Sequence, residues 1–403
     1  MLLRRLIAVI VLGDVGLGLV APLWALRAEG LGLSTVAIGA LVGALGAGRL
    51  VASLAGGLAG DRWGRRPVLV AGMLGLVLAG TGAGLTPVAG VLFPLRIVEG
   101  VGWELMAVSG IAALADIVRD LDRQGATAAR YQAARRGAQA ISPVVGGLLA
   151  GVIGIPRVFD VYGALALVAA VAAWRVLPAL PALPALPALP VRGRARRSVF
   201  GDLRAVGTDS SFASIGALGF LLTGADLTFQ QVLVPILGHD QGLSTLQIGA
   251  ILAAYGVLLA GASLGVGGRA IDRFGPRLPL GVGSGVAAVG YALVPAVHGF
   301  SGLAPALAVA GLGRGLSSAS PTVLLLRLFP LRQGGVQGAY RTVNGVGRLV
   351  IPIALAGAAL SLGPAVWGLS GAMVVAAGAA VRLTDRPLAR HPNGSGRPAE
   401  EPP

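Results

Sequence analysis

The sequence contains no cysteine and no lysine, and only three of its 403 residues are histidine. Without cysteine there can be no disulfide, no thiolate metal ligand and no thiol nucleophile. The histidines are too scattered for a metal-ligand spacing, at His239, His298 and His391. All 32 basic residues are arginine, and the net charge is +15. The arginines form short clusters without a basic stripe of interleaved aromatic residues, so we expect no nucleic-acid partner.

Charged residues are scarce, at 12% of the chain, whereas 55% of the residues are hydrophobic and the mean hydropathy is +0.80. A soluble domain of this length needs a far more polar surface. Apolar runs of about 20 residues recur from end to end, and this length spans a bilayer as a helix. The sequence therefore predicts an all-α, polytopic membrane protein with twelve transmembrane helices, near 6–26, 36–59, 67–86, 90–115, 137–156, 158–175, 212–236, 246–267, 279–297, 303–326, 340–360 and 364–381.

The first apolar run has the basic start of a secretory signal peptide. It continues from residue 6 to residue 26, however, and Asp14 interrupts it, so we interpret it as the first spanning helix. If the N-terminus is cytoplasmic, the outer loops contain only Arg27 and Arg157, and the other loop arginines lie inside. This bias predicts a multi-pass protein of the cytoplasmic membrane with both termini in the cytoplasm.

The composition changes at two places along the chain. Residues 176–211 contain LPALPALPALPALP followed by RGRARR. The regular prolines favour a polyproline II spacer, and the arginines can lie against anionic lipid head groups. We interpret this segment as a cytoplasmic tether, with a regulatory or docking role as the alternative. The predicted domains are thus a six-helix bundle at 1–175, the linker at 176–211, a second bundle at 212–383 and a disordered tail at 384–403.

The two halves of the chain repeat short motifs in the same order. LSTVAIGA at 33–40 corresponds to LSTLQIGA at 243–250, and GLAGDRWGRR at 57–66 corresponds to GRAIDRFGPR at 268–277. DRQGATAARYQ at 122–132 corresponds to LRQGGVQGAYR at 331–341, and Asp14 followed by Pro22 corresponds to Asp226 followed by Pro235. The offset stays between 209 and 213 residues. The repeat predicts two related six-helix bundles with a site between them, near the middle of the membrane.

Together, these features resemble the major facilitator superfamily over residues 5–383. The signature between its second and third helices, Gly-x-x-x-Asp-Arg-x-Gly-Arg-Arg, is complete at 57–66, and Pro276 replaces an arginine in the second copy. The fourth-helix motif has Glu99 where the family has glutamine; its other members are Arg96, Gly100 and Gly102. The fifth-helix motif typical of exporters is partial, because Ser142 replaces a glycine; the matching residues are Gly137, Pro143, Gly146 and Gly147.

The resemblance implies two bundles that rock about a central cavity. Cytoplasmic ion pairs, Asp61 with Arg123 and Asp272 with Arg332, would hold one conformation and break in the other. An exposed pair is worth only ~0–1 kcal/mol, so it can be broken in each cycle. The alternative is that the loop residues only anchor the topology and cap helices. The candidate latch residues are Gly57, Asp61, Arg62, Gly64, Arg65, Arg66, Arg123, Asp272, Arg273, Gly275, Arg277 and Arg332.

Charges inside the predicted spans each need a reason, because a charge at the bilayer centre costs at least ~2.5–3.5 kcal/mol. Arg96 and Glu99 are three residues apart and share a helix face, so we expect them to pair, either as a proton switch or as a static packing element. Nothing in its own helix neutralises Asp14. A carboxyl group in such surroundings can hold a proton at neutral pH, so Asp14 is the first candidate for proton coupling.

The remaining candidates for proton coupling or the substrate cavity are Glu104, Asp226, Arg314 and Arg348. Asp226 lies nearer the outer end of its helix and can instead be solvated. Arg341, Asn344 and Arg348 form one stripe, matched by Gln132, Arg135 and Gln139. We interpret Arg341 and Arg135 as snorkelling toward water, and Arg348 as part of the substrate path. Trp103 and Phe229 lie next to polar residues, where they can contact a substrate or pack in the core.

The resemblance and these charges predict proton-coupled export of small amphipathic organic molecules by alternating access. The alternative is proton-coupled uptake of a nutrient such as a sugar or an organic anion. Few asparagines occur in the helices, which favours export over sugar uptake, whereas the arginines keep an anionic substrate open. A membrane enzyme is not expected, because no nucleophile–base pair or metal cluster is present. A sensor that has lost transport is a further alternative. We expect a monomer that contacts lipids and a small-molecule substrate and uses a proton gradient, without a cofactor.

Overall fold

A computed structural model describes residues 2–118, 124–177, 209–329, 333–363 and 366. These residues form helices and contain no strand. The first half comprises α1 (Leu2–Val20), α2 (Leu23–Gly30), α3 (Thr35–Trp63), α4 (Arg65–Leu85), η1 (Ala89–Val91), α5 (Leu92–Val118), α6 (Gln124–Ile153) and α7 (Ile155–Val176).

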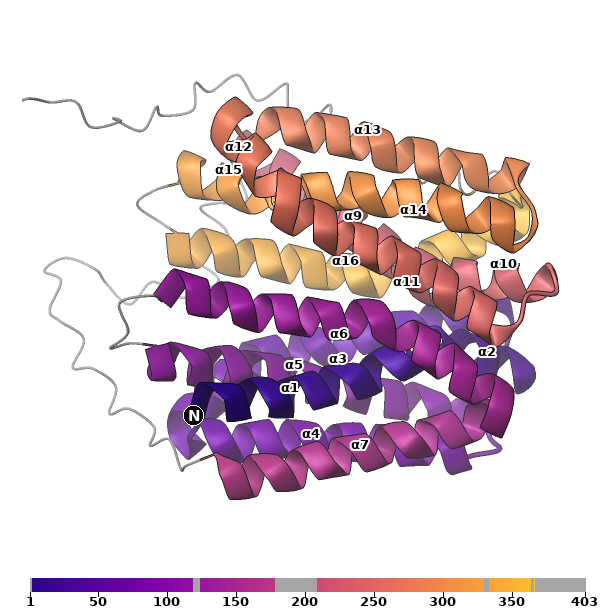
Figure 1. Ribbon diagram of the computed structural model, residues 1–403, viewed down its shortest axis with the longest axis horizontal. Helices are drawn as coiled ribbons and strands as arrows, with labels where there is room; N and C mark the ends of the chain where they lie inside the picture. The colour runs from indigo at the N-terminus through magenta and orange to yellow at the C-terminus, as the bar shows by residue number, and fades with distance from the viewer. Residues whose placement is uncertain (1, 119–123, 178–208, 330–332, 364–365, 367–403) are drawn as a thin grey trace, which may run out of the picture.

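The second half comprises α9 (Ser210–Thr228), the π-helical turn η2 (Phe229–Leu233), α10 (Val234–Asp240), α11 (Thr245–Ala262), the π-helical turn η3 (Ser263–Gly267), α12 (Gly268–Phe274), α13 (Arg277–Leu293), η4 (Val294–Ala296), α14 (Gly299–Ser317), α15 (Ser320–Leu328) and α16 (Gln333–Leu362). The helices run roughly side by side in two adjoining groups (Figure 1). The α3–α4 and α12–α13 hairpins, with their arginines, lie at one end of the molecule, which we call the arginine-rich end. The opposite end is formed by α2 and α10 (Figure 1).

Nine helices in the described part of the chain are long and apolar enough to cross a membrane, or ten if the bent pair α1 and α2 counts as one span. The predicted span at 303–326 does not meet this criterion. It is divided between α14 and α15, and Pro321 lies at the start of α15, where proline is tolerated. The twelfth predicted span lies outside the described residues except for Val366, and so does the whole tail. Of the linker, only residues 176, 177 and 209–211 are described.

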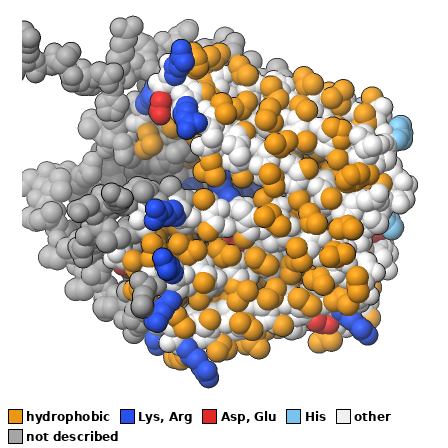
Figure 2. Space-filling view, in the orientation of Figure 1, with side chains coloured by type: hydrophobic (Ala, Val, Ile, Leu, Met, Phe, Trp, Pro, Cys, Tyr) orange, Lys and Arg blue, Asp and Glu red, His pale blue; other side chains and the backbone are white. Residues whose placement is uncertain are grey.

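The outer surface of the helices is apolar, as a membrane-spanning bundle requires. Leu78, Val152, Leu264 and Val289 are among many large hydrophobic side chains that are exposed. Figure 2 shows hydrophobic side chains over the middle of the molecule and most of the visible basic side chains at the arginine-rich end. Because lipid is as apolar as leucine, such exposure has no cost in a bilayer.

The charged hairpins of both halves turn at a glycine with a positive φ. Only Gly64 separates α3 from α4, with a φ of 88°, and Gly275 ends α12 with a φ of 75°. These are conformations that L side chains rarely adopt. The predicted spans at 36–59 and 67–86 leave seven residues between them, but α3 continues through Trp63 and the chain turns at a single glycine.

The two halves meet through repeat-related contacts. A Cβ added at Gly39 of α3 would overlap Pro352 O of α16, and a Cβ added at Gly249 of α11 would overlap Pro143 O of α6. Each contact lies toward the α2–α10 end, where the helix backbones touch because a glycine faces a carbonyl. Farther along, the facing residues Gln132 and Leu259 line a cavity instead. The halves are thus closed at the α2–α10 end and separated toward the arginine-rich end.

Candidate functional site

The central cavity lies between the two halves and has a volume of about 590 Å³. Side chains from α3, α5 and α6 of the first half form one wall, and side chains from α9, η2, α11 and α16 form the other. This volume is within the range of small-molecule sites in proteins. Among its polar lining residues are Gln132, Gln139, Thr223, Gln230, Gln231 and Tyr255.

Positive charge predominates in the wall of the central cavity. Among the residues that the structure describes, two carboxylates line it, Glu104 and Asp226. Five arginines of the described ranges line it, namely Arg49, Arg135, Arg136, Arg341 and Arg348. Two further charged residues stand directly behind the wall, since Asp14 contacts Arg135 and Arg314 contacts Asp226. A charge without a partner in a partly buried wall destabilises the fold, so the partner of each charged residue matters.

Asp14 forms the most completely buried of these pairs. Its side chain is 0% exposed and accepts hydrogen bonds from Arg135 Nε at 2.6 Å, from Arg135 Nη2 at 3.1 Å and from Gln139 Nε2 at 2.9 Å. The expectation of an unneutralised Asp14 is therefore wrong, because α6 supplies the counter-charge across the α1–α6 contact. The snorkelling interpretation of Arg135 is wrong for the same reason.

The second pair joins Arg49 of α3 to Glu104 of α5. Arg49 Nε donates to Glu104 Oε2 at 2.9 Å, and the guanidinium carbon lies 4.1 Å from the centre of the Trp103 ring. All three side chains line the cavity. Because this pair faces the cavity, a ligand or a proton can reach it without unfolding a helix.

The third pair joins Asp226 of α9 to Arg314 of α14, with 3.6 Å between Asp226 Oδ1 and Arg314 Nε. Tyr255 Oη donates to the same carboxylate oxygen and lies 3.4 Å from Tyr291 Oη. Asp226 keeps 22% of its side chain exposed, in the cavity wall. The two predicted residues are therefore brought together. Phe229, by contrast, stacks on Tyr291 and is buried, so it packs in the core.

Arg348 of α16 has a different environment. Its helix touches α3 so closely that a Cβ added at Gly46 would meet the Arg348 backbone. The Arg348 side chain lines the central cavity, as we expected for a substrate path, and it forms no ion pair or hydrogen bond with the residues that the structure describes.

Arg96 and Glu99 pair as predicted, in the buried region behind the cavity. Arg96 Nη1 donates to Glu99 Oε2, and Nη2 donates to Gln231 of η2 in the other half. Glu99 also accepts from Trp24 Nε1 at 3.3 Å and from Tyr162 Oη at 3.4 Å. Arg96 and Glu99 are each 1% exposed. The cluster therefore links the two halves by a fully buried polar contact.

The cluster around Arg96 contains residues that the sequence analysis missed. Nothing in the sequence distinguishes Gln231 from its neighbour Gln230. Trp24 and Tyr162 lie within the predicted apolar spans at 6–26 and 158–175. Aromatic side chains with one polar atom usually have a hydrogen-bond partner when they are buried, and this was the available signal.

The predicted latch residues are only partly described. The side chain of Asp61 and the residues Arg123 and Arg332 lie outside the described residues, so neither latch pair can be traced. Arg65 Nε lies 3.6 Å from Asp116 Oδ2, and Arg66 Nη1 donates to Leu177 O at 3.2 Å. These two arginines therefore hold helices of the first half together at the arginine-rich end.

Three residues of the partial fifth-helix motif lie in helix contacts, whereas no atom lies within 4 Å of a Cβ added at Gly137. Pro143 and Gly147 touch α11, where Thr245 Oγ1 donates to Gly147 O at 2.8 Å. Gly146 faces Leu19 of α1. The motif thus allows α6 to approach both α1 and the other half.

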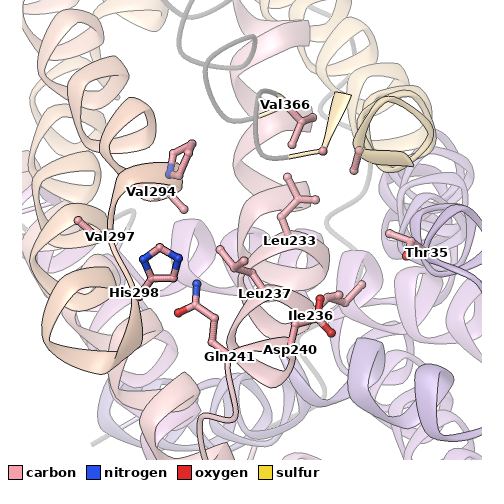
Figure 3. Close-up of a pocket in the computed structure, with 13 residues that line it drawn as sticks. Thr35, Leu233, Ile236, Leu237, Asp240, Gln241, Val294, Val297, His298 and Val366 are labelled. Atoms are coloured by element: carbon pink, nitrogen blue, oxygen red, sulfur yellow. The ribbon is translucent and has the colours of Figure 1, made fainter. Parts of the chain in front are cut away.

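A smaller cavity of about 320 Å³ lies in the second half, near the α2–α10 end (Figure 3). Leu233, Leu237 and Val294 give it an apolar wall, and His298 and Gln241 stand at its polar side. Gln241 Oε1 accepts a hydrogen bond from Gly299 N at 2.8 Å, so this side chain has a structural partner. In the described part of the chain, no group of three or more His, Cys, Asp or Glu side chains could hold a metal ion.

Comparison with known proteins identifies one family whose model matches both halves of the chain. The family model of the Major Facilitator Superfamily matches residues 6–221 and 216–402. The tetracycline resistance protein, class C, of Escherichia coli is 28% identical over 309 residues, which cover 74% of this chain and 73% of that protein.

Two solved structures are similar in fold. The nucleoside transporter NupG has a TM-score of 0.77 at 15% identity, covering 94% of this chain and 98% of its own. A D-xylose–proton symporter has a TM-score of 0.73 at 17% identity, covering 96% and 99%. At these identities the likeness concerns the fold alone.

Proposed function

The chain belongs to the Major Facilitator Superfamily and is a multi-pass membrane transporter rather than an enzyme, and we propose that it carries small organic molecules through the central cavity, driven by a proton gradient. The observation that carries this proposal is a cavity between the two halves that is closed at the α2–α10 end and walled by arginine–carboxylate pairs. A substrate enters from one side, and the contacts at the closed end break to release it on the other.

Glu104 and Asp226 are the first candidates for proton binding, because both line the cavity and can exchange protons with its water. Protonation would remove the negative partner of Arg49 or Arg314 and change the charge of the wall. Asp14 is completely buried behind Arg135 and is the third candidate. Arg96 and Glu99 would act as part of the contact between the halves.

Export in exchange for protons has one observation in its favour, the 28% identity to a tetracycline resistance protein. A resistance protein of this family suggests outward movement of amphipathic compounds. The shortage of asparagine in the helices agrees with this direction, since sugar sites usually need several amide groups.

Uptake or release of an organic anion together with a proton has a different observation in its favour, the excess of arginine over carboxylate in the cavity wall. This wall would repel a cation, and a neutral sugar would leave the positive charge of the wall uncompensated. An acidic substrate would compensate it.

In either direction we propose the cytoplasmic membrane as the location, with the arginine-rich end and both termini in the cytoplasm. The cavity of this structure would then be open to the cytoplasm. Each half contributes one wall of a single cavity, so a monomer would suffice for transport, with lipids around its apolar surface.

Reconstitution of the full chain in vesicles with an internal pH dye tests the proposal. A pH gradient is imposed, and lipophilic cations, neutral drugs and organic acids are added in turn. We expect substrate-dependent proton movement that is lost in Glu104→Gln or Asp226→Asn and kept in Arg5→Gln, whose side chain is exposed outside the cavity.

The class of compound that responds identifies the substrate, and the direction of proton movement separates exchange from co-transport. Proton movement that survives both carboxylate substitutions would move the assignment to Asp14. If no compound moved protons in any vesicle, proton-coupled transport would be refuted.

A further inference from the structure

In the described part of the chain, the arginines that line the central cavity outnumber the carboxylates that line it. Asp14 neutralises Arg135, Glu104 pairs with Arg49, and Asp226 pairs with Arg314 behind the wall. Among the described residues, three of the five lining arginines form no ion pair with a carboxylate, namely Arg136, Arg341 and Arg348. Arg136 and Arg341 are exposed toward the arginine-rich end, whereas Arg348 is partly buried deeper in the cavity.

We propose that Arg348 and Arg49 together bind the acidic group of an organic anion, whose apolar part lies against Trp103. This inference rests on the proposed function, because it takes the central cavity as the substrate path. Arg49 and Arg348 stand on α3 and α16, which touch at Gly46, and both side chains line the same cavity. One anion can therefore contact both halves of the molecule at once.

The chemistry of the site supports an acid. Guanidinium groups bind carboxylate or sulfonate oxygens through two parallel N–H donors, and such charge-assisted bonds are roughly twice as strong as neutral ones. Arg49 already holds a carboxylate, that of Glu104, at 2.9 Å. Arg49 lies over one face of the Trp103 ring, with its guanidinium carbon 4.1 Å from the ring centre, and the part of the ring that lines the cavity can contact an aromatic or aliphatic substituent.

Glu104 would compete with the substrate for Arg49. When Glu104 is ionised, it occupies one guanidinium; when it takes up a proton, that guanidinium becomes available to the anion. The anion and the proton therefore strengthen each other's binding, and this coupling is reciprocal. The other charged or titratable groups that face this space are Arg135 and Arg136 of α6, Asp226 of α9, Tyr255 of α11, and Arg341 and Arg348 of α16. Two solutes that bind together travel together, so the site selects co-transport over exchange for an acidic substrate.

The test measures binding to the purified full chain in nanodiscs by calorimetry. The probes are three acids, each with its uncharged amide: benzoate and benzamide, phenylbutyrate and phenylbutyramide, naphthalenesulfonate and naphthalenesulfonamide. We expect at least one acid to bind more tightly than its amide, and binding of the sulfonate to tighten as the pH is lowered. The sulfonate pair isolates titration of the protein, since the sulfonate stays ionised throughout.

Two substitutions have opposite expected effects. Arg348→Gln weakens binding of the acid by ~10-fold to ~100-fold, the loss of one charge-assisted contact, and leaves the amide unchanged. Glu104→Gln tightens binding of the acid and removes its dependence on pH, because Arg49 then has no competing carboxylate. A misfolded variant cannot bind more tightly, so this gain separates a site from a structural effect. Arg5→Gln is the control and should match the parent.

The inference is overturned if no acid binds more tightly than its amide, or if Arg348→Gln leaves the acid unaffected. Failure of the inference differs from failure of the proposed function. Proton movement in vesicles with a cation or neutral compound, without preferential acid binding, would keep proton-coupled transport and remove the anion site. Acid binding that depends on Arg348 and Glu104, without proton movement for any compound, would keep the site and remove proton-coupled transport.

Discussion

Asp14 and Asp226 stand at corresponding positions of the two halves and have opposite environments. Asp14 is 0% exposed and receives three hydrogen bonds from Arg135 and Gln139. Asp226 is 22% exposed in the cavity wall, and Arg314 lies at the longer distance of 3.6 Å. The repeat thus preserved a carboxylate in each half but gave one a closed ion pair and left the other within reach of solvent and ligand.

The difference follows from an exchange of residue types between α6 and α16. At the offset of 209, Arg135 corresponds to Asn344, and Gln139 corresponds to Arg348. The arginine of the second half therefore stands one helical turn farther along its helix, where it lines the cavity and forms no ion pair with Asp226. A single change of position converts a structural counter-ion into a charge available to a substrate.

The largest expected effect breaks the closed pair of the first half. Asp14→Asn leaves the Arg135 charge buried without a carboxylate, and we expect the free energy of unfolding to fall by about 3–5 kcal/mol. Unfolding of the purified protein by SDS titration measures it. The double variant Asp14→Asn/Arg135→Gln removes both charges and should recover most of the loss. If the double variant were no more stable than the single one, the pair would not be the cause.

The contacts between the halves give the next largest effect. Gly39→Ala and Gly249→Ala each place a Cβ against a carbonyl of the facing helix, at Pro352 and Pro143. We expect each to cost about 1–3 kcal/mol in the closed arrangement and to favour opening of the α2–α10 end. Accessibility of a cysteine introduced near that end reports the shift. Gly261→Ala is the control, because no atom lies near its added Cβ. Equal responses in that control would refute the specific contact.

Loss of the Asp226–Arg314 pair should lower the free energy of unfolding less than loss of the Asp14–Arg135 pair. Asp226→Asn removes the ionised partner of Arg314, but the asparagine oxygen still accepts from Tyr255, and part of the side chain contacts solvent. We expect a loss of about 1–2 kcal/mol in the same SDS titration. A loss as large as that of Asp14→Asn would contradict the distinction between a closed and an open carboxylate.

The smallest effect concerns the repeated helix starts. Ser244 forms a capping box with Gln247, whereas Ser34 only accepts from Ala37 N. Ser244→Ala should cost about 1 kcal/mol and Ser34→Ala about half as much, as measured by thermal unfolding in detergent. Ala37→Gln supplies the missing second hydrogen bond and should stabilise the first half slightly. No gain from Ala37→Gln would show that the two helix starts differ in more than this residue.

Much of the fold could be predicted from local patterns. Apolar runs of membrane-spanning length identified the helices, and the repeat identified the two related sets of helices. Arg96 and Glu99 could be paired from their spacing of three residues, because neighbours on one helix face are fixed by the helix itself. The position of the first charged hairpin followed from its signature at 57–66, although the helices approach Gly64 more closely than the hydropathy indicates.

The partners across helices could not be predicted in this way. Arg135 lies 121 residues from Asp14, and Gln231 lies 135 residues from Arg96. Neither spacing contains information about which helix faces which, and a neighbouring residue such as Gln230 fits the sequence pattern equally well.

The sequence by itself determined a helical membrane protein of two related halves with charged residues in its spans, because hydropathy and helical spacing act along the chain. Only the tertiary structure decided that Asp14 is neutralised, that Arg348 faces a cavity, and that the halves close at one end. Charge pairing and backbone contact act through space, so they depend on how distant helices pack against each other.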